Sequence, residues 1–250
     1  MSYRLVFVFN FFLIILLMKY VSWLLHPKIR RENLFKFIFK SPLLSARNYQ
    51  SSQQHKELFH FIILKLFLSG LYLSLIILVA REMLQPLNYF KVILISPIIY
   101  FLTEFCGSLG QLMFYPLSIK IPPIHRHPLI SKSLGEFWGR RWNIWVQDWL
   151  RDVSRYQRKS LIAKLFVTFL ISGIFHELMG NLPFLICFKR SHFGNMTLYF
   201  VIQGLGLWIE KKWVWKFPPT IHRLYLWLVV LLPAPLFINY PILLFFGILE

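Results

Sequence analysis

The chain has 250 residues, of which 57% are hydrophobic, 18% aromatic and only 15% charged, and this composition excludes a soluble globular protein. Its 28 lysines and arginines against 10 acidic residues give a net charge of +18, but they are divided among short segments between apolar runs, which argues against a nucleic-acid partner. Cys106 and Cys187 lie inside apolar stretches, so a disulfide-stabilised secreted scaffold is also excluded. We therefore expect a protein surrounded by membrane lipids.

Six apolar stretches come close to the length of about 20 residues that crosses a hydrocarbon core. They cover residues 5–25, 58–80, 92–117, 161–186, 197–210 and 224–249. The first has no small-residue cleavage site, so we expect it to remain as a span rather than to be removed as a signal peptide. The sequence thus predicts an all-α, multispan transmembrane bundle in which residues 1–250 form a single integral membrane domain.

Lysine and arginine are unevenly distributed over the connecting segments. There are seven in 26–57, two in 81–91, nine in 118–160, two in 187–196 and four in 211–223. Because cytoplasmic loops carry the excess of positive charge, this alternation predicts that both termini lie outside and that the three basic loops face the cytoplasm. The prediction requires all six spans.

The most basic of these segments has the pattern of an amphipathic helix over 134–158. Ser133 and Glu136 have the spacing of a capping box at its start. Apolar residues recur at spacings of three and four, and arginines gather on the opposite side: Leu134, Phe137, Trp138, Trp142, Trp145 and Trp149, against Arg140, Arg151, Arg155 and Arg158. One interpretation is an anchor in the cytoplasmic interface, with indoles at the headgroups.

Asn143, an amide within the indole stripe, favours a second interpretation, a binding site. Gly139 allows a backbone or a substrate to come close, and Arg140 and Arg141 carry planar guanidinium groups that suit phosphates. A phosphate-binding cytoplasmic helix beside a lipid-buried site is where we expect a coenzyme A ester.

The fourth apolar stretch contains His176 and Glu177 near its middle. Charged residues there cost about 2.5–3.5 kcal/mol each for Arg, Lys or Asp on translocon scales, so ionisable groups usually mark a function or a buried pair. Gly173 lies one turn before His176 and Gly180 one turn after it, which predicts a slot that suits an acyl chain. The alternatives are a packing histidine and, for Glu177, an ion pair with Lys164 or a residue on another span.

The sequence does not favour a metal site. The zinc motif His-Glu-x-x-His would need a histidine at position 180, which is Gly180. His125 and His127 are close enough to share a ligand, but no cysteine or carboxylate cluster accompanies them. We predict no metal and no bound cofactor.

Residues 137–143, followed by 172–178, resemble the wax synthase branch of the membrane-bound O-acyltransferase family, and 203–210 are similar to a third segment of these proteins. The resemblance covers about residues 95–250. It implies acyl transfer from acyl-CoA, as co-substrate, to a long-chain lipid alcohol at a site buried in a multispan fold. A sterol, a diacylglycerol or a terpenoid alcohol as acceptor, and acetyl-CoA as donor, stay open. The resemblance implies the endoplasmic reticulum membrane for a eukaryotic protein and the inner membrane for a bacterial one, and no oligomeric state is predicted.

The resemblance also assigns roles to individual residues. His176 is the membrane histidine, which we expect to act as general base, and Asn143 is its polar partner, which would donate to the thioester oxygen or hold the alcohol. The expected substrate-binding residues are Trp138, Arg140, Arg141, Trp142 and Gly173. The alternative of another class is a small transporter or a scaffold, because Glu104 and Lys65 also lie inside apolar stretches.

Overall fold

The computed structural model describes residues 2–25, 34, 37–38, 56–117, 121–155 and 161–249, and every regular element within these ranges is helical. Within them, the helices that are long and apolar enough to cross a membrane are Tyr3–Leu25, Leu58–Glu82, Tyr89–Phe114, Ala163–Phe188 and Pro219–Phe237. The predicted all-α membrane bundle is confirmed, and the chain is a multi-pass integral membrane protein.

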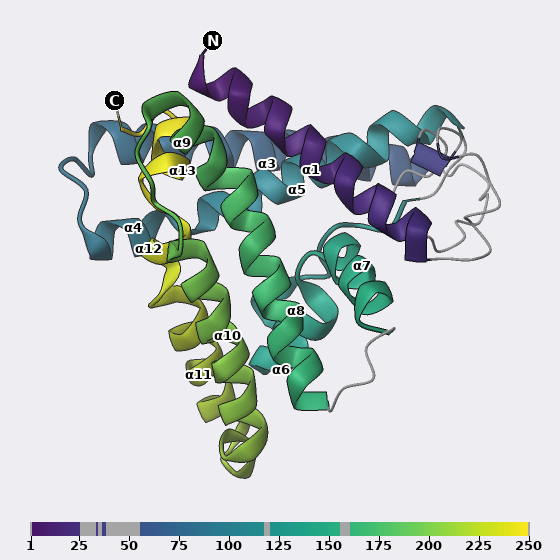
Figure 1. The fold of residues 1–250 in the computed structure, drawn as a ribbon, viewed down its shortest axis with the longest axis vertical. Coiled ribbons are helices and arrows are strands. Elements are labelled where there is room, and N and C mark those ends of the chain that lie inside the picture. Colours follow the sequence, from purple (N-terminus) through teal and green to yellow (C-terminus); the bar gives the residue numbers. More distant parts are fainter. Residues whose placement is uncertain are drawn as a thin grey trace.

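Two pairs of long helices form the frame of the molecule (Figure 1). In the first pair, α3 (Lys56–Glu82) packs along α5 (Pro97–Phe114). In the second, α8 (Leu161–His176) packs along α10 (Asn195–Lys212). Each pair joins two predicted spans that follow one another in the sequence, the second with the third and the fourth with the fifth. The site that they enclose depends on how the two pairs pack together.

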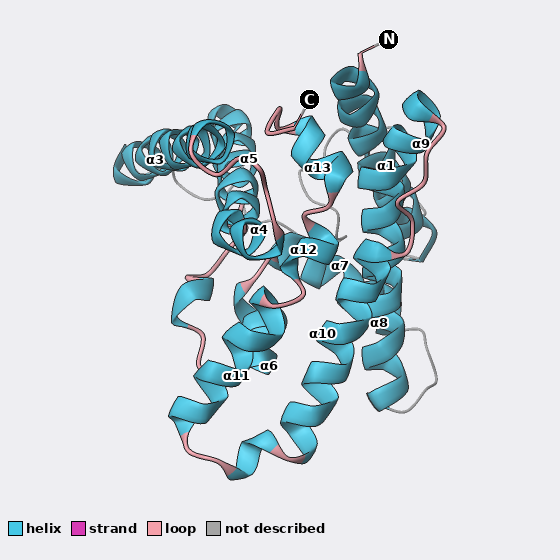
Figure 2. Ribbon diagram, turned by 90° about the vertical axis from the view of Figure 1, so that its left-hand side faces the viewer, coloured by secondary structure: helices cyan, strands magenta, loops and turns pink. Residues whose placement is uncertain are grey.

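Of the remaining helices, α1 (Tyr3–Leu25) and α11 (Pro219–Leu231) are the longest. α1 crosses and contacts both α7 (Ile144–Arg155) and α9 (Leu182–Phe188) (Figure 1). Figure 2 shows α10 and α11 extending away from α3 and α5, with α8 beside α10. The short helices are α4 (Tyr89–Ile95), α6 (Leu134–Glu136), α12 (Ala234–Phe237) and α13 (Tyr240–Phe245), with 3₁₀ turns at Tyr115–Leu117, Pro128–Ile130 and Val214–Lys216.

The last two predicted spans need correction. Residues 197–210 are helical within α10, but this helix is not apolar enough to be a candidate membrane span. Its buried polar residues include Gln203 and Glu210, which face other helices. The span expected over 224–249 is wrong as a single helix: prolines interrupt it, and α11, α12 and α13 take its place. The predicted position of both termini outside required six crossings and is not retained.

The single amphipathic helix expected over 134–158 is also wrong. It is interrupted after a π-helical turn, Phe137–Arg141, and α7 begins only at Ile144. The indole N–H groups of Trp145 and Trp149 donate to Pro122 O and Met18 O, both at 2.9 Å. These tryptophans therefore pack against protein rather than at lipid headgroups. Arg158 and the side chain of Arg155 lie outside the described residues.

Two carboxylates tie α10 to the segments on either side of it. Glu177, in a second π-helical turn (Glu177–Asn181), accepts from the backbone N–H groups of Gly194 and Thr197 at 2.8 and 2.9 Å, at the start of α10. It is thus a cap of α10, and the predicted pair with Lys164 is wrong. Near the other end of α10, Glu210 accepts from the N–H groups of Leu134 and Gly135 at 2.6 and 2.8 Å, at the start of α6.

An ion pair joins the first pair of helices. Lys65 on α3 contacts the buried carboxylate of Glu104 on α5, so the two ionisable groups that the sequence placed in separate spans compensate each other. This explains the acidic residue in the third span as part of the α3–α5 contact.

The slot expected beside Gly173 is occupied by protein. A Cβ atom at Gly173 would lie 2.8 Å from Cα of Thr197, so the glycine allows α8 to contact the backbone of α10. At Gly180 a Cβ atom would lie 2.7 Å from the end of the Met196 side chain. Neither glycine leaves room for an acyl chain, and the prediction of Gly173 as a substrate-binding residue is wrong.

We expect Gly173→Ala to lower the melting temperature of the purified protein in detergent, because α8 and α10 must separate; overpacking of this kind costs about 1–3 kcal/mol. Gly139→Ala is the matched control, since a Cβ atom there meets nothing within 4 Å. Equal melting temperatures for the two variants would contradict the close contact between the helices.

We also expect Gln203→Leu to destabilise the protein. Gln203 is fully buried, accepts from the indole N–H of Trp138 at 3.1 Å and donates to Val229 O at 2.8 Å. Its loss leaves a buried donor and a buried acceptor unpaired, at a cost of about 1–3 kcal/mol each. Thermal unfolding of this variant, of Trp138→Phe and of the double variant forms a cycle in which the double variant should lose less than the sum of the singles. Additive losses would count against the hydrogen bond.

Candidate active site

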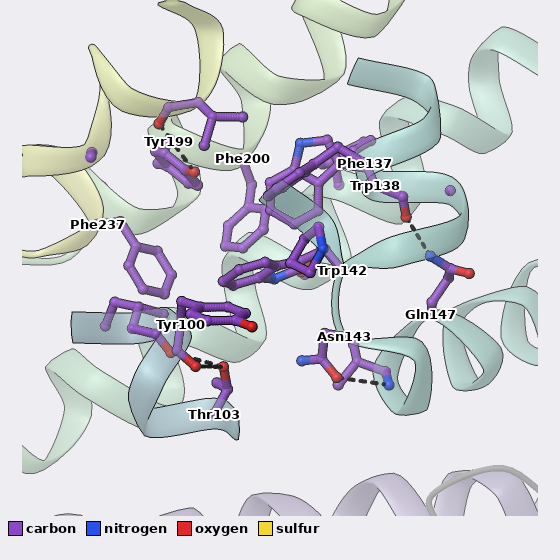
Figure 3. Close-up of a pocket in the computed structure, with 18 of the residues that line it drawn as sticks. Tyr100, Thr103, Phe137, Trp138, Trp142, Asn143, Gln147, Tyr199, Phe200 and Phe237 are labelled. Atoms are coloured by element: carbon purple, nitrogen blue, oxygen red, sulfur yellow. Dashed lines mark hydrogen bonds between the residues drawn. The ribbon is translucent and has the colours of Figure 1, made fainter. Parts of the chain in front are cut away.

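A cavity of about 720 Å³ lies between the two helix pairs. Its walls come from the α4–α5 junction, from the segment joining α6 to α7, and from α8, α10, α11 and α12, and they are mainly aromatic and aliphatic. Figure 3 shows Tyr100, Trp142, Phe200 and Phe237 gathered around it, with Asn143 on the side of α7. A large apolar cavity with few polar groups is the usual form of a site for an apolar ligand.

His176, the last residue of α8, lines this cavity. Its Nδ1 atom lies 2.7 Å from the carbonyl oxygen of Ser172. Because a carbonyl oxygen only accepts, the ring carries its proton on Nδ1, and Nε2 keeps a lone pair. No described group hydrogen-bonds to Nε2. The ring is held between Phe200 and Phe237, with centroids 4.6 and 5.2 Å away. The tautomer and orientation are those of a base directed at a ligand.

Asn143 lines the same cavity, so the structure brings together the two residues that the sequence placed 33 positions apart. Its backbone has φ 42°, in the left-handed region that asparagine tolerates better than most residues. The side-chain oxygen accepts from Val146 N at 3.3 Å, at the start of α7 (Figure 3). Within the described residues the amide nitrogen donates to no protein acceptor. Asn143 therefore forms the turn before α7 with its backbone, and its side-chain N–H groups have no acceptor among the described residues.

The two tryptophans of the first motif form walls of the cavity. Trp138 packs edge-on against Phe169, with ring centroids 5.8 Å apart, and its N–H is used by Gln203. Trp142 stacks on Phe137 at 5.3 Å. The backbone of this turn is fixed from α7, where Gln147 donates to Trp138 O at 2.5 Å.

The arginines separate into different roles. Arg141 forms an ion pair with Glu136 at 2.7 Å and donates to the carbonyl oxygen of Arg126 at 3.0 Å, so it holds the preceding loop rather than an anion. Arg151 lines the cavity and donates to Gly139 O and Gln147. Arg140 is exposed. Glu136 also accepts from Lys132 N, and this hydrogen bond, with the contact to Arg141, lowers the pKa of its carboxyl group.

The sequence did not identify His125 as part of this site. His125 is buried, and its ring lies 4.5 Å from the Trp142 ring and 5.2 Å from the Tyr100 ring. Burial, and secondarily the charge of Lys65, lowers the pKa of His125 to about 3. His127, its predicted companion, is exposed. The neighbours of His125 on α5, Thr103 and Tyr100, which line the cavity, carried no sequence signal because they lie inside an apolar run.

The chain is similar to known proteins over the part that contains the two polar residues Asn143 and His176 of this cavity. Residues 121–202 match the family described as membrane bound O-acyl transferase family, and this range contains both Asn143 and His176. Three relatives from Arabidopsis thaliana are named "Probable long-chain-alcohol O-fatty-acyltransferase 2" (30% identical over 46% of this chain and 36% of the relative), "Probable long-chain-alcohol O-fatty-acyltransferase 7" (26%, over 70% and 52%) and "Acyl-CoA--sterol O-acyltransferase 1" (31%, over 42% and 34%).

The chain thus spans between about a third and a half of the length of these relatives. The matched part is the part that supplies the turn before α7, α8 and the start of α10, and so both polar groups of the cavity. Through this region the chain is similar to the membrane bound O-acyl transferase family and to relatives named as probable long-chain-alcohol O-fatty-acyltransferases.

Proposed function

We propose that the chain transfers an acyl group from acyl-CoA to a lipid alcohol, with a long-chain alcohol as acceptor. The observation that carries this proposal is that His176 and Asn143 line one apolar cavity and that no described residue hydrogen-bonds to Nε2 of His176 or accepts from the side-chain amide of Asn143. A base and a hydrogen-bond donor at one apolar site are what esterification of an alcohol by a thioester needs.

In the proposed reaction, Nε2 of His176 removes the proton of the alcohol as its oxygen attacks the thioester carbonyl. Asn143 donates its amide N–H to the carbonyl oxygen, where negative charge develops. The carbon–sulfur bond then breaks, the imidazolium returns the proton to the coenzyme A sulfur, and an ester and free thiol leave. Neither Cys106 nor Cys187 lines the cavity, which supports direct transfer rather than a cysteine-bound acyl intermediate.

The coenzyme A phosphates would bind at the cationic edge of the cavity. Lys211 lines the cavity and Arg140 is exposed beside it on the π-turn, whereas Arg141 is occupied by Glu136. We therefore assign phosphate binding to Arg140 and Lys211 and exclude Arg141, which is a change from the role expected from the sequence. No bound cofactor takes part in the proposed reaction.

The acceptor and the compartment are proposals of the same kind. Relatives named for long-chain alcohols support that acceptor, and a sterol is the second candidate because one relative is named for sterols. We propose the endoplasmic reticulum membrane for a eukaryotic source and the inner membrane for a bacterial one. A transporter or scaffold role would leave the orientation of His176 and Asn143 without a purpose.

The proposal is tested by labelled palmitoyl transfer in membranes of a host without neutral-lipid synthases, supplied with hexadecanol, a sterol or a diacylglycerol. We expect an ester with hexadecanol. His176→Gln should reduce kcat by about 10²–10⁴-fold because it can still donate to Ser172 O but supplies no base. Asn143→Asp should reduce kcat by about 10²–10³-fold because it keeps the capping oxygen but loses the N–H donor.

Asn143→Gly is the matched control for the backbone, since glycine also adopts a positive φ. It should unfold near the wild-type temperature while remaining as inactive as Asn143→Asp. Wild-type turnover in well-inserted His176→Gln protein would overturn the assignment of the base. The absence of any ester from well-expressed wild-type protein would overturn the proposed function.

A further inference from the structure

His125 makes two hydrogen bonds through its two ring nitrogens. Nδ1 lies 3.1 Å from the backbone nitrogen of Asn143, and Nε2 lies 2.7 Å from Oγ1 of Thr103 on α5. The ring also packs at a tilt against Trp142, the neighbour of Asn143 in the chain. A single buried side chain therefore links α5 to the turn that presents the proposed N–H donor.

The direction of these hydrogen bonds follows from their chemistry. A backbone N–H only donates, so Nδ1 of His125 must be the acceptor and the ring proton must lie on Nε2. Nε2–H then donates to Thr103, whose hydroxyl in turn donates to Ile99 O at 2.8 Å. The chain Ile99–Thr103–His125–Asn143 is consistent in one direction only, and it requires a neutral imidazole.

The backbone conformation of Asn143 needs a hydrogen bond of this kind to stabilise it. Its φ of 42° is unfavourable for a residue with a side chain, and no helix continues through it. Trp142, just before it, is extended, and α7 begins just after it. Without the bond to His125 the Asn143 N–H would have no acceptor among the described residues, and the turn could relax toward an ordinary conformation.

We propose that His125 is a positioning residue for the proposed acyl transfer: it accepts the Asn143 N–H and thereby fixes the strained turn that directs the Asn143 amide into the cavity. This inference rests on the proposed function for its catalytic consequence. His125 does not touch the substrate in this account and acts only through Asn143.

Two substitutions separate the hydrogen bond from the packing of the ring. His125→Phe keeps a flat ring between Tyr100 and Trp142 but accepts nothing. His125→Asn places its side-chain oxygen where Nδ1 was and can still accept from Asn143 N. We expect His125→Phe to lower kcat on the order of 10²-fold with little change in KM for palmitoyl-CoA, since small displacements of a catalytic group have effects of that size. His125→Asn should recover most of the kcat.

The neighbouring residue on α5 provides a second pair of variants. Thr103→Val removes the acceptor that selects the Nε2–H tautomer, and we expect a lower kcat, whereas Thr103→Ser keeps the hydroxyl and should retain more of the kcat than Thr103→Val. This pair keeps the test decisive if His125→Phe fails to fold. Wild-type kcat in folded His125→Phe, or His125→Asn as inactive as His125→Phe at an unchanged melting temperature, would overturn the proposal.

A measurement without turnover addresses the same hydrogen bond. Because the pKa of His125 is about 3 when folded and 6.5 when unfolded, acidification below pH 6.5 protonates the unfolded chain first and removes stability. The other ionisable groups facing the ring, Lys65 on α3 with Glu104 and Tyr100 on α5, remain in every variant. The melting temperature should therefore fall more between pH 7.5 and 5.0 in the wild type than in His125→Asn.

The turnover assay and the acid shift of the melting temperature distinguish failure of the proposed function from failure of the proposed role of His125. Inactive wild-type membranes would overturn the proposed function, while the acid shift would still decide the protonation state on which the His125 bond depends. An acid shift of the same size in wild type and His125→Asn would overturn the proposed role of His125.

Discussion

The site depends on two carboxylates, one near each end of α10, that accept hydrogen bonds from backbone N–H groups. Glu177 holds the start of α10 to the π-turn that follows His176, and Glu210 holds the start of α6, from which the turn to Asn143 continues. Hydrogen bonds to a charged acceptor in a buried place are strong and directional. Because α10 is bound to both segments, it helps to fix the distance between the proposed base and the proposed donor, together with the direct contact of Trp138 with Phe169 on α8.

Both polar groups of the cavity lie next to backbone that departs from α-helical geometry. The first motif contains the π-turn Phe137–Arg141 and a left-handed residue, and the second motif runs into the π-turn Glu177–Asn181. Such turns are found frequently at functional sites, where the extra residue redirects neighbouring side chains. Here Gln147 donates to Trp138 O, Gln203 accepts from the indole N–H of Trp138, and Glu177 accepts from Thr197 N. The site is rigid because its irregular backbone is bonded to regular helices.

The sequence was sufficient to predict a membrane protein and four of the five long apolar helices, because the length of an apolar stretch is a local signal. It also predicted that Asn143 and His176 belong to one site, because the residues of the two motifs are visible in the sequence. The sequence did not predict the roles of residues that depend on contacts with other segments. The role of Gly173 depends on the backbone of Thr197, and Arg141 is occupied by Glu136, which no periodicity reveals. The amphipathic pattern over 134–158 concealed a break, since a π-turn keeps side chains near helical spacing. His125 was recognised only as a possible metal ligand, because the acceptor role of its Nδ1 requires knowing where the Asn143 N–H points.

The central claim is that one cavity binds the acyl donor between His176 and Asn143. The most direct measurement is photolabelling of the protein in its membranes with a diazirine-bearing palmitoyl-CoA, with and without excess unlabelled palmitoyl-CoA, followed by peptide mapping. The account predicts labels on cavity walls such as Phe200, Phe237 and Trp138 that disappear with competitor. Labels confined to the lipid-exposed face of α3, at residues such as Phe67 and Leu78, and insensitive to competitor would contradict it.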